Sequence, residues 1–317
     1  MKNKYFLGLV VFALMLMLNA CSNKALEEAT AAIDSYNKAA DTYNKAIEPY
    51  NEAVGTIEEA NAELQKVLDT AQQSIDAGNP PFDEETLTAL KEAMASGTSA
   101  KVGVPDLLQA YEAMEVSEEA KKADLEALTE EANTKLAEIE EATIPETPTA
   151  PDYSEVQKSI TDATSVYQDS IQSLKQVTAP EDAFVMERLQ GIETITAIDA
   201  VTEDHDPNNQ LNKQGGYIGC VYFADTQVDR SKLYIEDGKD NVIDVGTIGG
   251  GAVEIFKTAQ EAETRNAYLG GFDGTGFSSG SHHVIGTCII RTSDNLTGTQ
   301  QTELTEKITE ALTRVVH

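Results

Sequence analysis

The stretch Tyr36–Glu63 repeats a seven-residue pattern as YNKAADT, YNKAIEP, YNEAVGT and IEEANAE. The first position holds Tyr36, Tyr43, Tyr50 and Ile57, the fourth holds alanine, and the fifth adds Ile47 and Val54. A stripe this wide is typical of a helix in a bundle more than of a two-stranded coiled coil. We therefore predict one long helix from Lys24 to about Ala77, kinked at Pro49, because proline lacks the N–H that a helix interior needs.

Further helices are predicted on the C-terminal side of this repeat. Asn79-Pro80-Pro81 ends the first helix, and a second is expected from Asp83 to about Ala95. Pro105 is expected to open a long helix with Leu108, Tyr111, Met114, Leu125, Leu128, Ala132 and Ile139 on one face. A last helix is expected over Tyr153–Val177. Because none of these helices buries its stripe alone, we expect an antiparallel bundle or coiled-coil spacer over residues 21–178, with association of copies through the helices left open.

The N-terminal residues resemble a bacterial lipoprotein signal. Lys2 and Lys4 precede the apolar run Phe6–Leu18, which is short for a membrane span of about 20 residues but suits a signal peptide. The run ends in Leu18-Asn19-Ala20-Cys21, which resembles the lipobox of bacterial lipoproteins, with Asn19 a less usual residue at its position. The resemblance implies removal of residues 1–20, lipid such as palmitate on Cys21, and a location on the extracytoplasmic face of the cell membrane. The alternative is an ordinary signal peptide or an uncleaved anchor.

The charge balance excludes several classes of protein. The 317 residues contain 54 Asp and Glu against 23 Lys and Arg, for a net charge of −31. Binding to phosphates of nucleic acids, or to anionic lipid surfaces, needs clusters of Lys and Arg that this chain lacks. We predict no nucleic-acid partner, and we interpret runs such as Glu130-Glu131 as solvated helix faces.

From about residue 179 the pattern changes to short strands between helices. Strands are predicted at Ile195–Val201, Tyr217–Ala224, Gly251–Lys257 and His283–Arg291. Capping boxes are predicted at Thr178-x-x-Glu181, Thr258-x-x-Glu261 and Thr297-x-x-Gln300. The chain is therefore predicted to be α+β, with a small ferredoxin-like domain over residues 179–317 whose helices cover one face of the sheet.

This second region resembles a C-terminal domain of uncharacterised lipoproteins from Gram-positive bacteria. The phrases that carry the resemblance are Ala200–Asn208, Lys213–Tyr217, Gly250–Phe256, Phe272–Gly276 and Val284–Arg291. The resemblance implies an envelope location and a recurring domain, and it brings no activity or catalytic residue with it.

Two groups of polar residues are candidate metal ligands. Asp204, Asp206 and Asn208 alternate like the first ligands of a calcium loop, but Asn209 and Gly215 stand where such a loop has glycine and glutamate. An acidic turn is the favoured alternative. His282 and His283 adjoin each other on a predicted strand, where neighbouring side chains point to opposite faces, so no metal site is predicted there.

Three further residues have two interpretations each. Cys220 and Cys288 lie within predicted strands, where they are either buried free thiols or the two halves of a disulfide, which an exported protein permits. Arg291 ends a strand and either pairs with one of the aspartates or faces a ligand, the first being favoured.

These patterns support a non-enzymatic surface lipoprotein without cofactors. Its helices space the α+β domain from the membrane, and the domain binds an envelope protein or a glycan. The alternative is a small-ligand receptor, for calcium or a glycan, with Asp204–Asn208, Tyr217 and Arg291 as contacts. An envelope enzyme is the least favoured hypothesis, because no nucleophile or acid–base pair stands at a recognised spacing.

Overall fold

A computed structural model describes residues 3–117, 119–275 and 280–316, with side chains from residue 23 onward. Its helices are α1 (Asn3–Asp76), α2 (Glu84–Ala100), α3 (Lys122–Glu141), α4 (Ser154–Gln176), α5 (Asp182–Gln190), α6 (Val242–Val245), α7 (Ala259–Gly270) and α8 (Gly298–Thr313). Its strands are β1 (Ile195–Ala200), β2 (Gly219–Asp225), β3 (Gly250–Ile255), β4 (Ser281–Ile285) and β5 (Cys288–Thr292), and two 3₁₀ turns are η1 (Arg230–Lys232) and η2 (Gly246–Gly249). The fold is α+β, as predicted.

The chain divides into two compact units. One contains residues 1–66 and 99–155, and the other contains residues 67–98 and 156–317. The boundary predicted at residue 178 falls inside the second unit. The side chains of the predicted lipobox, Leu18 to Cys21, lie outside the described ones. Within the described residues, none of the helices has an apolar stretch of the length that a membrane crossing needs.

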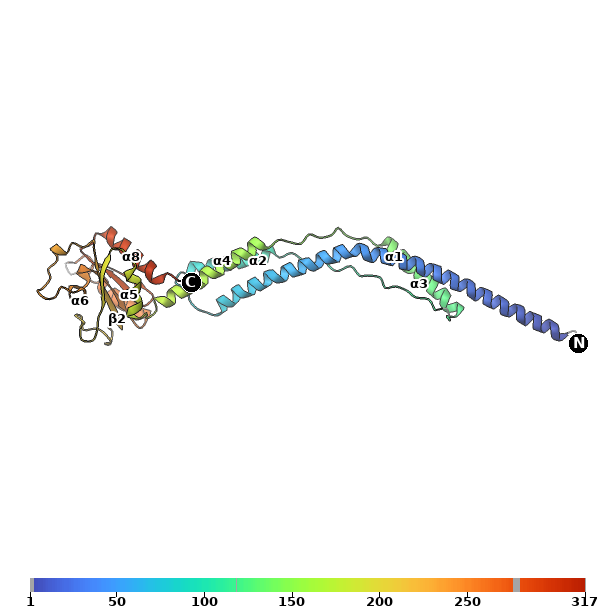
Figure 1. Cartoon of the computed structure of the whole chain (residues 1–317), viewed down its shortest axis with the longest axis horizontal. Coiled ribbons are helices and arrows are strands. Elements are labelled where there is room, and N and C mark those ends of the chain that lie inside the picture. Colours follow the sequence, from blue (N-terminus) through green and yellow to red (C-terminus); the bar gives the residue numbers. More distant parts are fainter. Residues whose placement is uncertain (1–2, 118, 276–279, 317) are drawn as a thin grey trace. The chain divides into compact units, whose positions relative to one another are not determined.

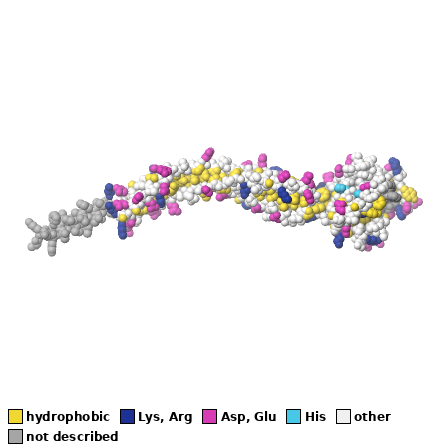
Figure 2. All heavy atoms as spheres, turned by 180° about the vertical axis from the view of Figure 1, so that it is seen from behind, with side chains coloured by type: hydrophobic (Ala, Val, Ile, Leu, Met, Phe, Trp, Pro, Cys, Tyr) yellow, Lys and Arg dark blue, Asp and Glu magenta, His cyan; other side chains and the backbone are white. Residues whose placement is uncertain are grey.

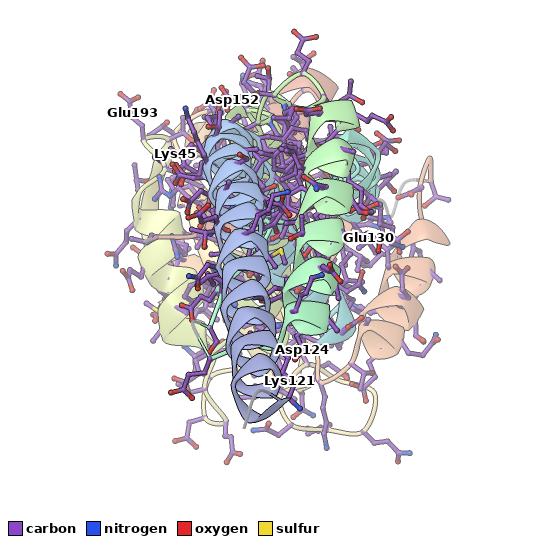
Figure 3. The ribbon with its side chains drawn as sticks, turned by 90° about the vertical axis from the view of Figure 1, so that its right-hand side faces the viewer. Lys45, Lys121, Asp124, Glu130, Asp152 and Glu193 are labelled. Atoms are coloured by element: carbon purple, nitrogen blue, oxygen red, sulfur yellow. The ribbon has the colours of Figure 1, made fainter. Side chains whose placement is uncertain are left out.

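Helix α1 confirms the interpretation of the heptads as a buried stripe. Tyr36, Ile47 and Ile57 are each no more than 2% exposed, and the helix continues through Pro49. Tyr36 packs with Ala132 and Ile139 of α3, so the tyrosine stripe lies in a core and does not form an open ligand platform. Figure 3 shows α1 and α3 side by side, with Glu130 at the outer surface.

The helix predicted from Pro105 is wrong for its first half. Residues 101–117 are not helical and run along α1, where three asparagines of the heptad repeat hold them (Figure 1). The Asn44 side chain donates to the carbonyl of Tyr111 at 2.8 Å and accepts from the N–H of Tyr111 at 2.9 Å. Asn37 pairs in the same two-bond manner with Met114, and Asn51 pairs with Leu108. Only α3, over Lys122–Glu141, is helical in this predicted span.

The register of this pairing follows from simple lengths. Seven residues of helix rise about 10.5 Å. Three residues of chain cover that distance only when almost fully extended, at about 3.5 Å each. We call this series of asparagine pairs the asparagine ladder. Seven residues after Asn51 the helix has Glu58, and three residues before Leu108 the extended segment has Pro105, which has no N–H to donate. The ladder therefore skips that step, and Asn61 donates to the carbonyl of Val102 instead.

In the second unit, the end of α1 packs with α2 and α4. A side chain in place of Gly97 on α2 would lie 2.6 Å from Ile160 of α4 and 3.3 Å from Leu68 of α1, so the helices approach closely there. Of the predicted bundle, the second unit thus contains these three segments, while α3 packs on α1 in the first unit. The acidic side chains of the helical part lie on its surface, beside the apolar stripe, in Figure 2.

The sheet has the order β1-β2-β3-β5-β4, and every neighbouring pair is antiparallel. This order does not confirm the ferredoxin-like detail, since that fold joins its elements in the order βαββαβ, whereas β1 is followed here by β2 with no helix between them. The single strand predicted at His283–Arg291 is instead the hairpin of β4 and β5. Its turn, Gly286-Thr287, needs glycine, because Gly286 has φ of 57° and an added Cβ would lie 2.4 Å from the carbonyl of Val177.

Helices cover both faces of the sheet, not one as predicted. On one face, Val221, Phe223 and Ile290 pack against Leu189 of α5 and Ile308 of α8. On the other face, Cys220, Ala252 and Ile289 pack against Ala262 of α7 and Ile243 of α6. Both faces of β2, β3 and β5 are buried as a result.

The capping boxes at Thr258 and Thr297 are confirmed. The one predicted at Thr178 is wrong: α5 begins after Glu181, which makes no side-chain cap, and the Thr178 hydroxyl donates to the carbonyl of Leu174 in the last turn of α4.

Candidate functional site

A buried group of three charges lies on the α7 face of the sheet. Glu254 of β3 is 0% exposed, and its carboxylate accepts two bonds from Arg265 of α7, at 2.9 Å from Nε and 3.0 Å from Nη2. Arg291 of β5 donates to the same carboxylate at 2.7 Å. Burial alone would raise the pKa of Glu254, but the bond from Arg265 and the charge of Arg291 outweigh it and hold that pKa below its usual value. Two guanidinium groups face one carboxylate, so the group carries an excess positive charge.

Arg265 joins this group to an open groove. Its side chain is 25% exposed, and its guanidinium lies 5.4 Å from the centre of the Tyr268 ring. The Tyr268 side chain is 59% exposed and packs edge-on against Phe272 at 5.2 Å. The groove has a volume of about 500 Å³ and is lined by Asn208, Gln210, Gly215, Gln260, Glu261, Thr264, Arg265 and Tyr268. We call it the α7 groove.

Asp206 holds the turn that brings Asn208 and Gln210 to the lining of the α7 groove. Asp206 Oδ1 accepts from the backbone N–H of Asn208 at 3.0 Å and from the Tyr217 hydroxyl at 2.5 Å. Its Oδ2 accepts from the N–H groups of Gln210 at 2.6 Å and Leu211 at 2.7 Å. Partial burial would raise the pKa of Asp206, but these bonds outweigh it and lower that pKa. Asp206 therefore fixes the turn that carries Asn208 and Gln210 into the groove.

The bonds to Asp206 argue against the calcium hypothesis. A carboxylate has about four lone-pair positions, and protein donors occupy all four at Asp206. The Asn208 amide donates to the Tyr222 hydroxyl at 2.8 Å, and Asp204 is exposed. Among the described residues, no group of three or more His, Cys, Asp or Glu side chains is placed to hold a metal ion. The acidic turn, the favoured alternative, is what the structure contains.

Tyr217 and Arg291, proposed from sequence as ligand contacts, are structural. Tyr217 is 2% exposed, and burial together with its bond to Asp206 raises its pKa. Arg291 is 7% exposed and has a structural ion pair, as favoured, but its partner is Glu254 and not one of the aspartates. Neither side chain lines the α7 groove.

The histidines make separate contacts. Nε2 of His205 lies 2.9 Å from Oδ1 of Asp244. Nδ1 of His282 lies 2.5 Å from Oδ1 of Asn266, and its Nε2 lies 3.2 Å from Oδ2 of Asp273. His283 is exposed. The pair His282-His283 is thus divided between two surroundings, as expected for neighbours on a strand.

Cys220 and Cys288 are free, buried thiols. Cys220 belongs to the core on the α7 face of the sheet, and Cys288 belongs to the core on the α8 face. The disulfide is therefore not formed, because the sheet separates the two sulfur atoms. Burial raises the pKa of Cys288 to about 12 and raises that of Cys220 too, so both remain protonated and behave as small apolar residues.

Sequence reasoning missed Arg265 and Tyr268, the two side chains that define the α7 groove. The available signal was the spacing of Gln260, Thr264 and Tyr268, which recur every four residues and so share one face of a helix. Glu254 gave a second signal, since an acidic residue within an apolar strand needs a buried partner. The partner itself, eleven positions away in sequence, required the fold.

Comparison with models of protein families, with curated proteins and with solved structures finds no match for this chain. The function must therefore be argued from the residues and their geometry.

Proposed function

We propose that this chain is a lipid-anchored, non-enzymatic lipoprotein of the cell envelope, whose helical part spaces an α+β domain that binds an envelope partner. The observation that carries the proposal is the sequence Leu18-Asn19-Ala20-Cys21 directly after an apolar run of signal-peptide length. Lipid on Cys21 would hold the chain at the extracytoplasmic face, because each buried CH₂ group contributes about 0.8 kcal/mol to membrane binding.

The structure of the first unit suits a spacer. Helix α1 alone is a single rod, but α3 and the asparagine-held segment 101–117 add lateral contacts along it. Asn37, Asn44 and Asn51 each join α1 to the segment 101–117 by two hydrogen bonds between side chain and backbone. This supports a role in which the first unit keeps its length while carrying the α+β domain.

The α7 groove supports a binding role for that domain. It combines an exposed aromatic ring, a guanidinium with an excess positive charge behind it, and the amides of Asn208, Gln210 and Gln260. Glu261, the one carboxylate of the groove lining, already accepts the backbone N–H of Thr258 in the capping box. These groups offer contacts for a partner and present no acid–base pair, which favours binding over catalysis.

A glycan receptor is the second candidate function. Tyr268, 59% exposed beside several planar amides, is the observation that favours it, because a ring face and amide donors suit the two faces of a sugar. The calcium version of this hypothesis is dropped, since Asp206 has no lone pair left for a cation.

The anchor is tested by labelling. The full chain and its Cys21→Ser variant are expressed in a bacterial host that is fed radioactive palmitate. We expect label and membrane recovery for the wild type, and loss of the label in Cys21→Ser. Cys220→Ser serves as the matched control and keeps the label. Equal labelling of Cys21→Ser, or recovery of the wild type in the cytosol, would contradict the proposal.

A further inference from the structure

Strand β4 has an outer edge that carries backbone groups pointing away from the sheet. The N–H of Phe256 donates to the carbonyl of Thr287, and the N–H of Ser293 donates to the carbonyl of Gly250. The backbone groups of every second residue between Thr287 and Ser293 therefore point toward β3, and those of the residues in between point toward β4. By alternation along the ladder, Ser281, His283 and Ile285 face β5, so the N–H and C=O groups of His282 and Val284 point outward. Within the described residues, β4 pairs with β5 alone.

In the described residues of β4, this edge shows none of three common protections of an edge strand. Edge strands are commonly blocked by charged residues, proline or a bulge. The opposite edge, β1, has a register shift between Ile195 and Ala197 and contains Asp199. The sequence of β4, Ser-His-His-Val-Ile, contains no proline, lysine or carboxylate, and its pairing with β5 is regular throughout.

A groove of about 680 Å³ adjoins the same edge. Its other wall is the flank of α8 beside the buried residues Leu304 and Ile308. The lining residues are Ser281, His282, His283, Thr302, Thr305, Glu306, Thr309, Glu310 and Thr313. The stretch of α8 from Thr302 to Thr313 rises about 16 Å, which is the length of about five residues of extended chain. The groove therefore has the length of β4 itself.

We propose that the β4 edge and this groove bind a basic segment of another protein in extended conformation, added to the sheet as a further strand. Backbone bonds to His282 and Val284 hold the segment, and every second side chain enters the groove toward the threonines of α8. Glu306 and Glu310 are exposed on the groove wall and select lysine or arginine at those positions. This site lies on the α8 side of the sheet and is independent of the α7 groove.

A second copy of this chain fits the edge poorly. Pairing two β4 edges would bring together two molecules that each carry a net charge of −31, and would place Glu306 and Glu310 of both copies near one another. Charge complementarity therefore favours a basic partner over self-association.

The experiment uses the full chain and a capped peptide of alternating lysine and valine, about seven residues long. We expect saturable binding, with slower hydrogen exchange at the amides of His282 and Val284. The same peptide N-methylated at alternate positions cannot complete the ladder and should not bind. A peptide with glutamate in place of lysine should also fail.

Matched variants separate charge from fold. Glu306→Lys should weaken binding about fivefold, the effect of losing one exposed ion pair and adding a repulsion. Glu303→Lys changes an equally exposed residue of α8 that does not line the groove, and should leave the affinity unchanged. Absence of binding, equal effects of the two variants, or unchanged exchange at Val284 would overturn the proposal. So would a chain that sediments as a dimer and pairs through β4.

Discussion

Glu254 stands in the centre of the α+β domain, where an isolated charge would be very unfavourable. It is tolerated because Arg265 and Arg291 complete its hydrogen bonds from two different elements. The carboxylate thus joins α7 to β3 and β5, and it fixes the orientation of Arg265 beside the α7 groove. A single buried residue therefore links the core to the surface that we propose for binding.

Glu254→Gln should lower the free energy of unfolding by about 3–5 kcal/mol, because it leaves the buried guanidinium of Arg291 and the partly buried one of Arg265 without their carboxylate. Urea unfolding of the full chain, followed by the signal of the α+β domain, measures this change. Glu263→Gln, at an exposed position of α7, is the control and should have almost no effect. A loss below about 1 kcal/mol for Glu254→Gln would contradict this role.

The same carboxylate predicts a dependence on pH. The pKa of Glu254 is lowered in the folded state, so its stabilising contribution is complete above the unfolded value of about 4.3. The contribution is lost as the pH falls through the lower folded value. Below about pH 5, the unfolding free energy of the wild type should therefore fall more steeply than that of Glu254→Gln.

The sequence of the α+β domain showed which side chains are able to bind a ligand, but it did not show which of them are already bonded within the fold. Asp206, Tyr217 and Arg291 all have side chains that suit a ligand. Each is occupied by a neighbour that the sequence places up to 37 positions away, as Glu254 is from Arg291. Only the fold shows which polar groups are already satisfied and which, like Tyr268, remain exposed.

At the scale of elements, the asparagines of the heptad repeat decide the structure of residues 101–117. Asparagine is a poor helix former, so its return at Asn37, Asn44 and Asn51 needs a reason. The reason is the paired bonds to the backbone of Met114, Tyr111 and Leu108. The helical repeat thus contains the information for a second, non-helical element.

Replacing Asn44 by Ala should release this element locally. The N–H and C=O of Tyr111 lose their partner, at a cost of about 1–3 kcal/mol if water does not replace it. Hydrogen exchange of the Tyr111 amide should become faster while α1 keeps its helical circular dichroism. Thr42→Ala, an exposed change on the same helix, is the control. Unchanged exchange at Tyr111 would show that the asparagine ladder does not hold the segment.

Helix α1 and the capping boxes at Thr258 and Thr297 were predictable because local pattern and tertiary packing agree there. The segment after Pro105 was not, because Leu108, Tyr111 and Met114 recur every three residues, a spacing that fits a helix face and an extended chain alike. The β4–β5 hairpin was missed since apolar residues continue on both sides of Gly286, and only its positive φ reveals the turn.

At the scale of the whole molecule, the acidic excess has a consistent interpretation. The acidic side chains of the helical part lie on its surface (Figure 2). In the α+β domain, Arg265 and Arg291 both pair with the carboxylate of Glu254, and Arg265 lines the α7 groove. A net charge of −31 makes copies of the chain repel one another, which would suit the lipid-anchored chain that we propose. The proposed anchor and the proposed binding groove belong to separate parts of the sequence, as a presenting lipoprotein requires.

The central claim, that the α7 groove binds an envelope partner, is tested most directly by site-specific photo-crosslinking in intact cells. A benzophenone amino acid replaces Thr264, which lines the groove, or Ala267, which is exposed on the same helix outside it. The account predicts a discrete adduct from position 264 that is absent from position 267, and mass spectrometry of that adduct distinguishes a protein from a glycan. Equal adducts from both positions, or none from position 264, would contradict it.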